Sequence, residues 1–324
     1  MSLFASKICR LVFPLTFVVA CQTTKINQDV LQGNEYAKDG LLREAAESYQ
    51  KAIKADAAYF PAYRNLGMIY VKMGEYKRAT RNLEISMESY ENDFDANYYL
   101  GEAYRGQDKY AEAIFRYKKS LTIRKDDPRA LKPLAWSYFK IRYYSEALVT
   151  ARKLSVVAKD DDQTSIILAR TLLKLKRPRE ALAVIKKGKS KIKRSSLPYY
   201  HSVEGDIQYE MGHTKLAIKN YRAALKVQPL LAGALLGLGK SMLKNNQDPK
   251  AITYLERAIR IRPRLTEAYF LLGKVYENKD RQKSLQYYRS FRKQASADPE
   301  FLAMMNEVKS RMTKLHSNSK SKNL

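Results

Sequence analysis

The sequence predicts an all-α fold in which short helical hairpins stack on one another as a solenoid. A small residue recurs every 34 positions at Ala45, Ala79, Ala113, Ala147 and Ala181, and the series continues at Ala217, Ala251 and Ser284. A second small-residue series runs in step with it, through Gly33, Gly67, Gly101, Ala135, Ala169, Gly205, Gly239 and Gly273. A fixed repeat of this length is typical of stacked helical pairs, because one pair cannot bury its apolar face alone.

One repeat shows how the hairpin is built. Gly67 and Tyr70 fall on one face of a first helix, and Ala79 and Leu83 fall on one face of a second. Gly74 lies between them, where a short turn between helices often needs a positive φ. The small residues let the two backbones approach, and the large ones fill the space beside them.

The repeat length, the small residues and the recurring tyrosines closely resemble the tetratricopeptide repeat (TPR) family over residues 26–298. The resemblance implies a right-handed superhelical solenoid of about eight hairpins, whose first helices line a concave, peptide-binding groove. After Pro299, apolar residues at helical spacing predict a capping helix over 299–315, which solenoids need to cover their last face. We expect residues 316–324 to form a disordered basic tail. A repeat step of 36 residues suggests a hinge near 186–198.

The first 20 residues have the pattern of a signal peptide. Lys7 and Arg10 precede a short apolar run over residues 11–20, which is too short to span a bilayer. The run ends at Cys21 in a pattern that resembles the bacterial lipobox. The resemblance implies cleavage before Cys21, lipidation of that cysteine and a short tether over 21–25. The alternatives are an uncleaved N-terminal anchor with an incidental cysteine, or a buried helix.

This lipoprotein interpretation predicts a protein held in the cell envelope by its lipid. By analogy with Gram-negative lipoproteins, Gln22 favours the outer membrane, with the chain facing the periplasm. The cysteines are Cys9 and Cys21 alone, so processing would leave no disulfide and no thiolate metal site.

Signals for catalysis were sought and are absent from the sequence. His201, His213 and His316 have no partners at metal-ligand spacing, and there is no glycine-rich phosphate loop or nucleophile motif. We therefore expect no enzyme activity, no metal and no cofactor.

The formal net charge of +27 predicts attraction to anionic surfaces, acidic proteins or nucleic acid. The plainer interpretation is that the charge serves solubility alone. Nucleic acid would not be a natural partner of an exported protein.

Transferring the family's groove positions gives a set of basic and aromatic candidates. They are Arg64, Arg105, Arg129, Lys132, Trp136, Phe139, Lys140, Arg170, Lys174, Tyr209, Lys240 and Lys244. An aromatic anchor beside fixed cations suits an extended acidic peptide or a free carboxylate. The alternative for Trp136 is an ordinary core position between repeats.

The predicted function is that of a membrane-anchored, extracytoplasmic adaptor that binds protein segments in this groove. TPR lipoproteins of similar layout include type IV pilus pilotins, so a role in pilus or secretin assembly is the first expectation. One alternative is a cell-surface scaffold that binds an anionic polymer or lipid headgroups. Another is a cytoplasmic TPR protein with RNA or protein partners.

Overall fold

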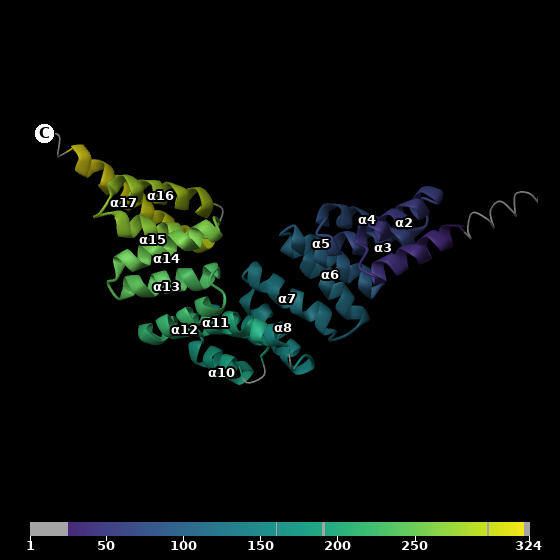
Figure 1. Ribbon diagram of the computed structural model, residues 1–324, viewed down its shortest axis with the longest axis horizontal. Coiled ribbons are helices and arrows are strands. Elements are labelled where there is room, and N and C mark those ends of the chain that lie inside the picture. The colour runs from purple at the N-terminus through teal and green to yellow at the C-terminus, as the bar shows by residue number, and fades with distance from the viewer. Residues whose placement is uncertain (1–24, 160, 190–191, 297, 321–324) are drawn as a thin grey trace, which may run out of the picture. The chain divides into compact units, whose positions relative to one another are not determined.

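The computed structural model describes residues 25–159, 161–189, 192–296 and 298–320 (Figure 1). Every regular element among these residues is helical, as the sequence predicts. The chain divides into two compact units, Met1–Lys159 (unit 1) and Asp160–Leu324 (unit 2). Residues 1–24, which hold the predicted signal peptide and Cys21, lie outside the described residues.

Unit 1 consists of four hairpins. Its first helices are a helix over 25–38, α3 (Phe60–Lys72), α5 (Phe94–Gly106) and α7 (Pro128–Lys140). Its second helices are α2 (Leu42–Ala55), α4 (Tyr76–Tyr90), α6 (Tyr110–Ile123) and α8 (Tyr144–Val157). The first helices carry the predicted groove positions, and the second helices cover their other side.

Unit 2 repeats this plan and ends in an additional helix (Figure 1). Its first helices are α9 (Asp162–Lys174), α11 (Leu197–Glu210), α13 (Ala232–Lys244) and α15 (Thr266–Tyr276). Its second helices are α10 (Pro178–Lys189), α12 (Thr214–Val227), α14 (Asp248–Ile261) and α16 (Arg281–Ala295). The 3₁₀ turns η1 (Arg194–Ser196) and η2 (Pro299–Phe301) precede α11 and α17 (Leu302–Lys320).

Each hairpin closes on the small residues found in the sequence. The alanine series of the second helices, from Ala45 to Ala251, is fully buried, and Ser284 takes its place in the last hairpin. A Cβ added to Gly101 would lie 2.6 Å from the Tyr117 ring, and one added to Gly67 would lie 2.5 Å from Leu83 Cγ. The missing Cβ is what lets a large side chain fill the hairpin.

The large partner follows the small residue by 16 positions in most repeats. Tyr49, Leu83, Tyr117, Tyr221 and Leu255 occupy this place opposite glycine. In the two repeats where alanine replaces the glycine, the residue at that spacing is Ala151 or Ile185. The larger Ala135 is thus matched by the small Ala151, as close packing requires, whereas Ile185 is as large as the leucines that face glycine.

The turn inside each of the first seven hairpins uses one left-handed residue. Gly40, Gly74 and Gly212 have φ values of 78°, 76° and 83°. The equivalent positions in other repeats are Asp108, Arg142, Lys176 and Asn246, with φ between 55° and 67°. The turn predicted at Gly74 is thus confirmed, and non-glycine residues adopt the same conformation at a cost of about 1–2 kcal/mol each.

The capping helix covers the last hairpin of unit 2. Val308 and Met312 of α17 pack with Phe270, Tyr288 and Phe291 in one buried cluster. Without α17 these aromatic rings would face water, so the helix performs the covering role predicted for residues 299–315. It runs on to Lys320, past the end expected at 315. Residues 321–324 are not among those described.

The division between the units falls at residue 159/160. The segment 186–198, where we expected a hinge, lies within unit 2 and includes η1 and the start of α11. The hinge stays a prediction.

Candidate functional site

The twelve predicted groove residues lie on first helices, as the repeat register requires. Seven are in unit 1, on α3, α5 and α7, and five are in unit 2, on α9, α11 and α13. We call these two sets the inner face of unit 1 and the inner face of unit 2. The structure brings residues together within each face, and the two faces differ.

The inner face of unit 1 combines aromatic rings with arginine. The Arg129 guanidinium lies 4.6 Å from the Phe94 ring centroid and 5.9 Å from that of Tyr98. Phe94 and Tyr98 are stacked, with centroids 6.1 Å apart. Burial, followed by the charge of Glu102, raises the pKa of Tyr98 to about 12, so its hydroxyl stays protonated at neutral pH. Phe94 is buried, so the aromatic surface here is that of half-buried Tyr98, with the exposed Arg129 guanidinium over it.

Trp136 and Phe139 extend this surface on α7. Their rings meet edge to face at 5.5 Å, and Phe139 meets Tyr144 of α8 at 5.6 Å. Both side chains are half-buried rather than part of the fully buried core. Lys132 and Lys140 lie on the same stripe of α7, one turn on either side of Trp136. Their role in binding stays a prediction.

Several predicted cations are already paired with acids. Arg105 Nε donates to Glu102 Oε1 at 3.0 Å, and this hydrogen bond raises the arginine's pKa. Glu102 also accepts the Tyr117 hydroxyl from the buried side. Arg64 lies 3.4 Å from Asp93, and Arg129 lies 3.1 Å from Asp95. The charge surplus counted from the sequence is therefore partly neutralised on this face.

The inner face of unit 2 is an alternating row of opposite charges. Lys240 Nζ lies 2.7 Å from Glu267, and the charges of Arg170 and Lys240 act on Asp206 between them. Burial raises the pKa of Asp206, and the two cations oppose that rise. Burial likewise lowers the pKa of Arg170, against the charge of Asp206. In such a row each positive side chain is offset by a neighbouring carboxylate.

Tyr209 and Lys244 complete the predicted set on this face. The ammonium groups of Lys240 and Lys244 lie 5.2 Å and 5.1 Å from the Tyr209 ring centroid. Burial lowers the pKa of Lys240, but the charge and hydrogen bond of Glu267 outweigh that effect and raise it overall. Both lysines thus have an aromatic partner within this unit.

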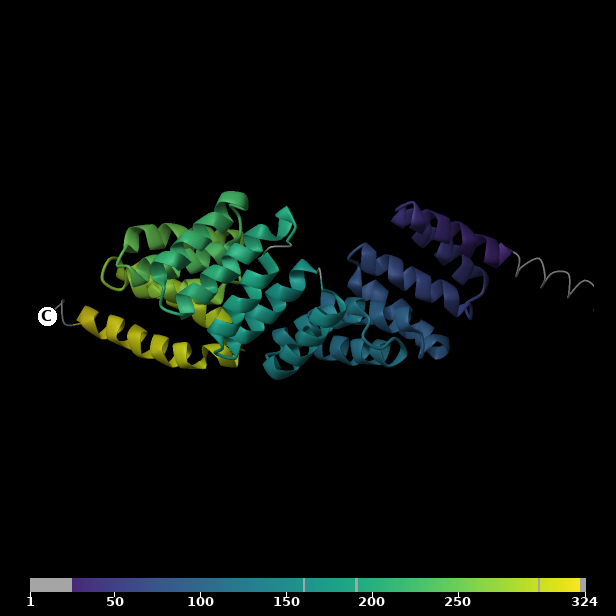
Figure 2. The same cartoon turned by 90° about the horizontal axis from the view of Figure 1, so that it is seen from below.

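An ion pair joins the two ends of unit 2. Lys174 Nζ, at the end of α9, lies 2.7 Å from Glu300 of η2, which follows 126 residues later. The yellow capping helix that follows η2 begins beside teal helices of the same unit (Figure 2). Farther along α17, Arg311 Nη1 lies 2.8 Å from Glu277, which caps α15. Predicted groove residue Lys174 is therefore bonded to the capping segment of its own chain.

Sequence reasoning missed the tyrosine–acceptor pairs that link the core to the inner faces. Tyr49 donates to Asn34 at 2.7 Å, and Tyr221 donates to Asp206 at 2.8 Å. Tyr117 and Glu102 make the same pair, and in all three the acceptor stands 15 residues before the tyrosine. The signal was present in these three repeats: the residue after glycine is an acceptor where the buried partner is Tyr49, Tyr117 or Tyr221. Where the partner is leucine, that residue is Met68 or Lys240. The last hairpin departs from this rule, because Lys274 follows Gly273 and Tyr288 donates to Glu277 instead.

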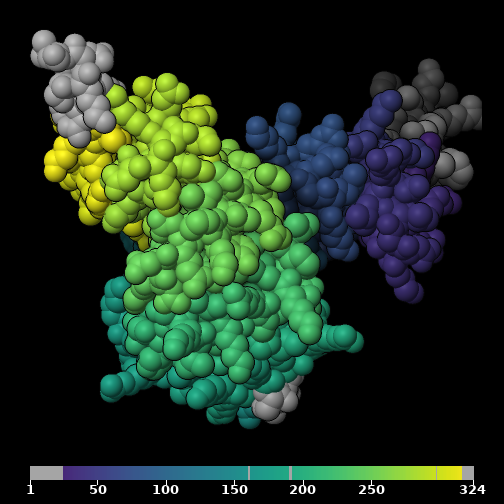
Figure 3. Space-filling view, turned by 60° about the vertical axis from the view of Figure 1, so that its left-hand side comes forward, coloured from purple at the N-terminus to yellow at the C-terminus, as the bar shows by residue number. Residues whose placement is uncertain are grey.

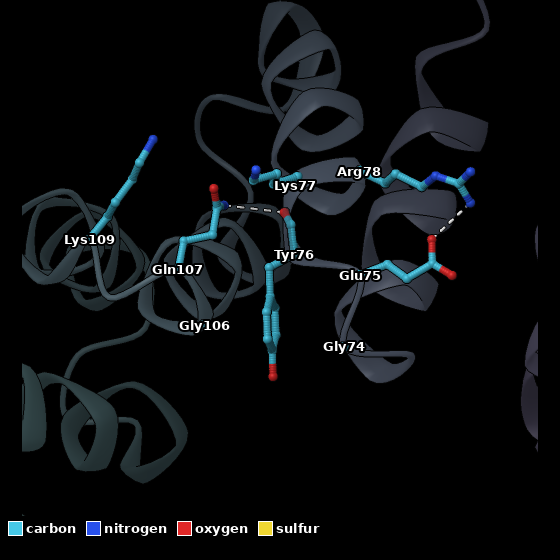
Figure 4. A pocket seen from close by; sticks show the side chains of 8 residues that line it. All are labelled: Gly74, Glu75, Tyr76, Lys77, Arg78, Gly106, Gln107 and Lys109. Atoms are coloured by element: carbon cyan, nitrogen blue, oxygen red, sulfur yellow. Dashed lines mark hydrogen bonds and ion pairs between the residues drawn. The ribbon is translucent and has the colours of Figure 1, made fainter. Parts of the chain in front are cut away.

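A shallow hollow of about 610 Å³ lies between neighbouring hairpins of unit 1 (Figure 4). It is formed by the turn at Gly74 and the segment 106–109. Gln107 closes its floor by donating to the Tyr76 carbonyl at 3.3 Å and to Thr80 Oγ1 at 2.7 Å. Lys77 and Lys109 stand at its rim, and it contains no nucleophile–base pair.

Within the described ranges there is no group of three or more potential metal-ligating side chains. Among the same residues, no helix is both long enough and apolar enough to cross a membrane.

Family profiles now identify the repeat. Profiles described as tetratricopeptide repeat or TPR repeat match residues 33–74, 59–126, 203–266 and 267–296. The chain belongs to the tetratricopeptide repeat family. A profile for anaphase-promoting complex, cyclosome, subunit 3 matches residues 106–188. No curated protein matches the TPR chain by sequence.

Solved structures agree with this fold. A TPR protein from Parabacteroides merdae is 16% identical, with a TM-score of 0.65, and the match covers 79% of this chain and all of that one. The APC/C hetero-tetramer Cut9–Hcn1 gives 13% identity and a TM-score of 0.63 over 85% of this chain and 52% of that one. Pseudomonas aeruginosa pilF gives 19% and 0.52, covering 68% of this chain and 98% of that one. At these identities the likeness shows the fold alone.

The family assignment confirms the predicted fold class and the general role. A TPR solenoid is a scaffold for protein–protein interaction, and no catalytic family matches the chain.

Proposed function

We propose that this TPR protein is an envelope-anchored scaffold that holds a segment of a partner protein on the inner face of unit 1. The carrying observation is the aromatic pair of Trp136 and Phe139 on a helix that also presents Lys132 and Lys140. Half-buried aromatic anchors with cations one turn away suit an extended segment with acidic groups or a free carboxylate.

The inner face of unit 2 is less suited to this role. Lys240 and Lys174 are each within 2.7 Å of a carboxylate of their own unit. A peptide that bound there would have to replace these ion pairs and separate charges that compensate each other. Unit 1 is thus the better candidate for the first contact with a partner.

We further propose anchoring through an acylated Cys21, in the outer membrane facing the periplasm if the host is Gram-negative. The support is the lipobox-like sequence before Cys21, together with a fold that works as a scaffold. More than one acyl chain would hold the protein firmly, since each buried CH₂ contributes about 0.8 kcal/mol. Among envelope roles, assistance in pilus or secretin assembly remains the first candidate. Exported in this way, the protein would not meet nucleic acid.

Site-specific photo-crosslinking in cells tests the binding surface. A photoreactive residue at Lys140, on the inner face of unit 1, is expected to form a discrete adduct with a partner. The matched position is Lys118, which is exposed on the second helix α6 of the same unit. An adduct at 118 and none at 140 would overturn the assignment. Once the adduct is identified, the purified partner segment should bind the wild-type chain and lose affinity with Trp136→Ala.

Mass spectrometry of the mature N-terminus tests the anchor separately. The expected result is a diacylated or triacylated Cys21 in the wild type and no acylation in Cys21→Ser. An intact, unmodified N-terminal segment would contradict the envelope location while leaving the crosslinking result meaningful.

A further inference from the structure

The positive charge of the chain is concentrated on the second helices of unit 2. Helices α10, α12, α14 and α16 carry 16 Lys and Arg against 3 Asp and Glu. The first helices of the same unit carry 5 against 5. In unit 1 the second helices carry 11 against 6. The surplus therefore lies away from the inner faces.

The helical geometry of α12 shows which way these side chains point. Its buried stripe is Ala217, Tyr221 and Ala224, which face the first helices. Lys219, Arg222 and Lys226 form a second stripe at i, i+3 and i+7, and all three are exposed. Helix α12 contains no acidic residue, so this side of it is purely cationic.

The neighbouring second helices repeat the pattern in register. Lys226 is followed 34 residues later by Arg260 and 33 residues after that by Lys293. We call the exposed cations on these three helices the outer basic face of unit 2; they are Lys219, Arg222, Lys226, Arg257, Arg260, Arg289, Arg292 and Lys293. Helices of unit 2 pack side by side into a continuous surface (Figure 3).

These cations differ from those of the inner faces in their partners. None of the salt bridges between described residues involves a member of the outer basic face. Like charges held in rows repel one another, and only solvent ions or an anionic partner can offset that repulsion. An anionic surface outside the protein would neutralise this charge.

Exposed aliphatic side chains accompany the cations at the helix ends. Val227 and Leu230 follow Lys226 with 49% and 67% of their surface exposed, and Ile261 follows Arg260 with 37% exposed. The ends of successive second helices lie together, since Gln294 of α16 donates to the Pro263 carbonyl, just after α14, at 2.9 Å. Cations and aliphatic groups therefore share one edge.

We propose that the outer basic face of unit 2 docks on the surface of an anionic lipid bilayer. Lipid phosphates would face the rows of Lys and Arg, and Val227, Leu230 and Ile261 would enter the interfacial layer. Single-stranded nucleic acid fits less well, because bases stack on aromatic side chains. Tyr199 is the one exposed large aromatic residue in the described part of unit 2, and it lies on a first helix. This surface is distinct from the peptide-binding face of unit 1.

Vesicle co-sedimentation tests the proposal directly. The full chain carrying Cys21→Ser, which cannot be acylated, is mixed with vesicles of equal parts phosphatidylglycerol and phosphatidylcholine, or with phosphatidylcholine alone. The difference between the two isolates charge-dependent binding. We expect binding to the anionic vesicles that falls steeply with salt. The variant Lys219→Glu/Arg222→Glu/Lys226→Glu should lose about 100-fold or more, since each basic side chain at such a surface multiplies affinity about fivefold.

The matched control is Arg43→Glu/Lys51→Glu/Lys54→Glu. It reverses three exposed charges on one second helix of unit 1, so the net charge changes by the same amount. We expect this control to keep most of the affinity, and Val227→Ser/Leu230→Ser to weaken binding without any change in charge. Circular dichroism verifies that each variant is folded.

Three outcomes would overturn the proposal. Equal loss in the α12 variant and the α2 control would show that only net charge matters. Equal binding to both kinds of vesicle would show that the anionic headgroup is not needed for binding. Salt-sensitive binding of an oligonucleotide such as poly(U), without binding to the anionic vesicles, would assign the face to nucleic acid.

Discussion

The inner faces of the two units are built from equivalent helices of the repeat in the same register, yet they present different side chains. In unit 1, Arg129 lies over the rings of Phe94 and Tyr98, and Trp136 and Phe139 continue the aromatic surface. In unit 2, Lys240 meets Glu267 and Lys174 meets Glu300. Arginines of the first face are also paired with acids, as Arg64 is with Asp93 and Arg129 with Asp95, so charge pairing alone does not distinguish the faces. What distinguishes the inner face of unit 1 is the pair of half-buried aromatic rings beside its cations.

The largest effect should come from the packing that both units share. Gly101→Ala in unit 1 and Gly205→Ala in unit 2 each place a Cβ 2.6 Å from a tyrosine Cε1. Overpacking of this kind costs about 1–3 kcal/mol, so thermal or urea unfolding should show similar losses for both. The control is Gly233→Ala, where nothing lies within 4 Å and alanine should stabilise the helix by about 0.5–1 kcal/mol. A loss of unfolding free energy for one of these two variants and none for the other would contradict the idea that both units depend on a missing Cβ at this position.

The next largest effect should come from removing a tyrosine–acceptor hydrogen bond, and its size should differ between the two units. Tyr221→Phe removes the hydroxyl that donates to Asp206, and Tyr117→Phe removes the one that donates to Glu102. Each loss should cost about 1–2 kcal/mol of unfolding free energy. We expect the larger loss for Tyr221→Phe, because Glu102 keeps its bonds to Arg105. Equal melting temperatures for both variants and the wild type would contradict the structural role of these bonds.

Alkaline titration should report partly buried tyrosines of unit 1. Burial raises the pKa of Tyr98, Tyr104 and Tyr110 to about 12 each, above the usual value of about 10. Between pH 10 and 12 the folded state therefore binds more protons than the unfolded state, and stability falls as the pH rises. Absorbance at alkaline pH should show a fraction of the 24 tyrosines ionising only near 12 or on unfolding. A single reversible transition of all tyrosines near pH 10 would contradict this burial.

The smallest effect is expected for the ion pair that joins the ends of unit 2. The Lys174 and Glu300 side chains are 42% and 45% exposed, so Glu300→Gln should change stability by less than about 1 kcal/mol. Glu277→Gln should cost more, since Glu277 and its partner Arg311 are only 20% and 28% exposed. Differential scanning calorimetry of the two variants tests this order. A larger loss for Glu300→Gln would mean that the pair at the end of α9 holds unit 2 together.

Much of the fold was predictable because the repeat rests on short-range geometry. The alanine and glycine series mark positions where two backbones meet, and every one of those alanines on the second helices is buried. The residues of the candidate site were predictable only as helix positions. Whether a cation such as Lys174 meets an acid depends on Glu300, which stands 126 residues away, and no local pattern encodes that contact. Three of the tyrosine pairs were within reach of sequence reasoning, since they share a spacing of 15 residues. The pair of Tyr288 and Glu277 in the last hairpin has a different spacing of 11.

The most direct test of the account compares two charge-reversal variants in one pair of assays. Lys132→Glu/Lys140→Glu changes the inner face of unit 1, and Lys219→Glu/Lys226→Glu changes the outer basic face of unit 2. Each is scored for binding of the crosslinked partner segment and for sedimentation with anionic vesicles. The first variant should lose binding of the partner segment and keep binding to the vesicles, and the second should do the reverse. Loss of partner binding in the second variant, with none in the first, would contradict the assignment of the binding face to unit 1.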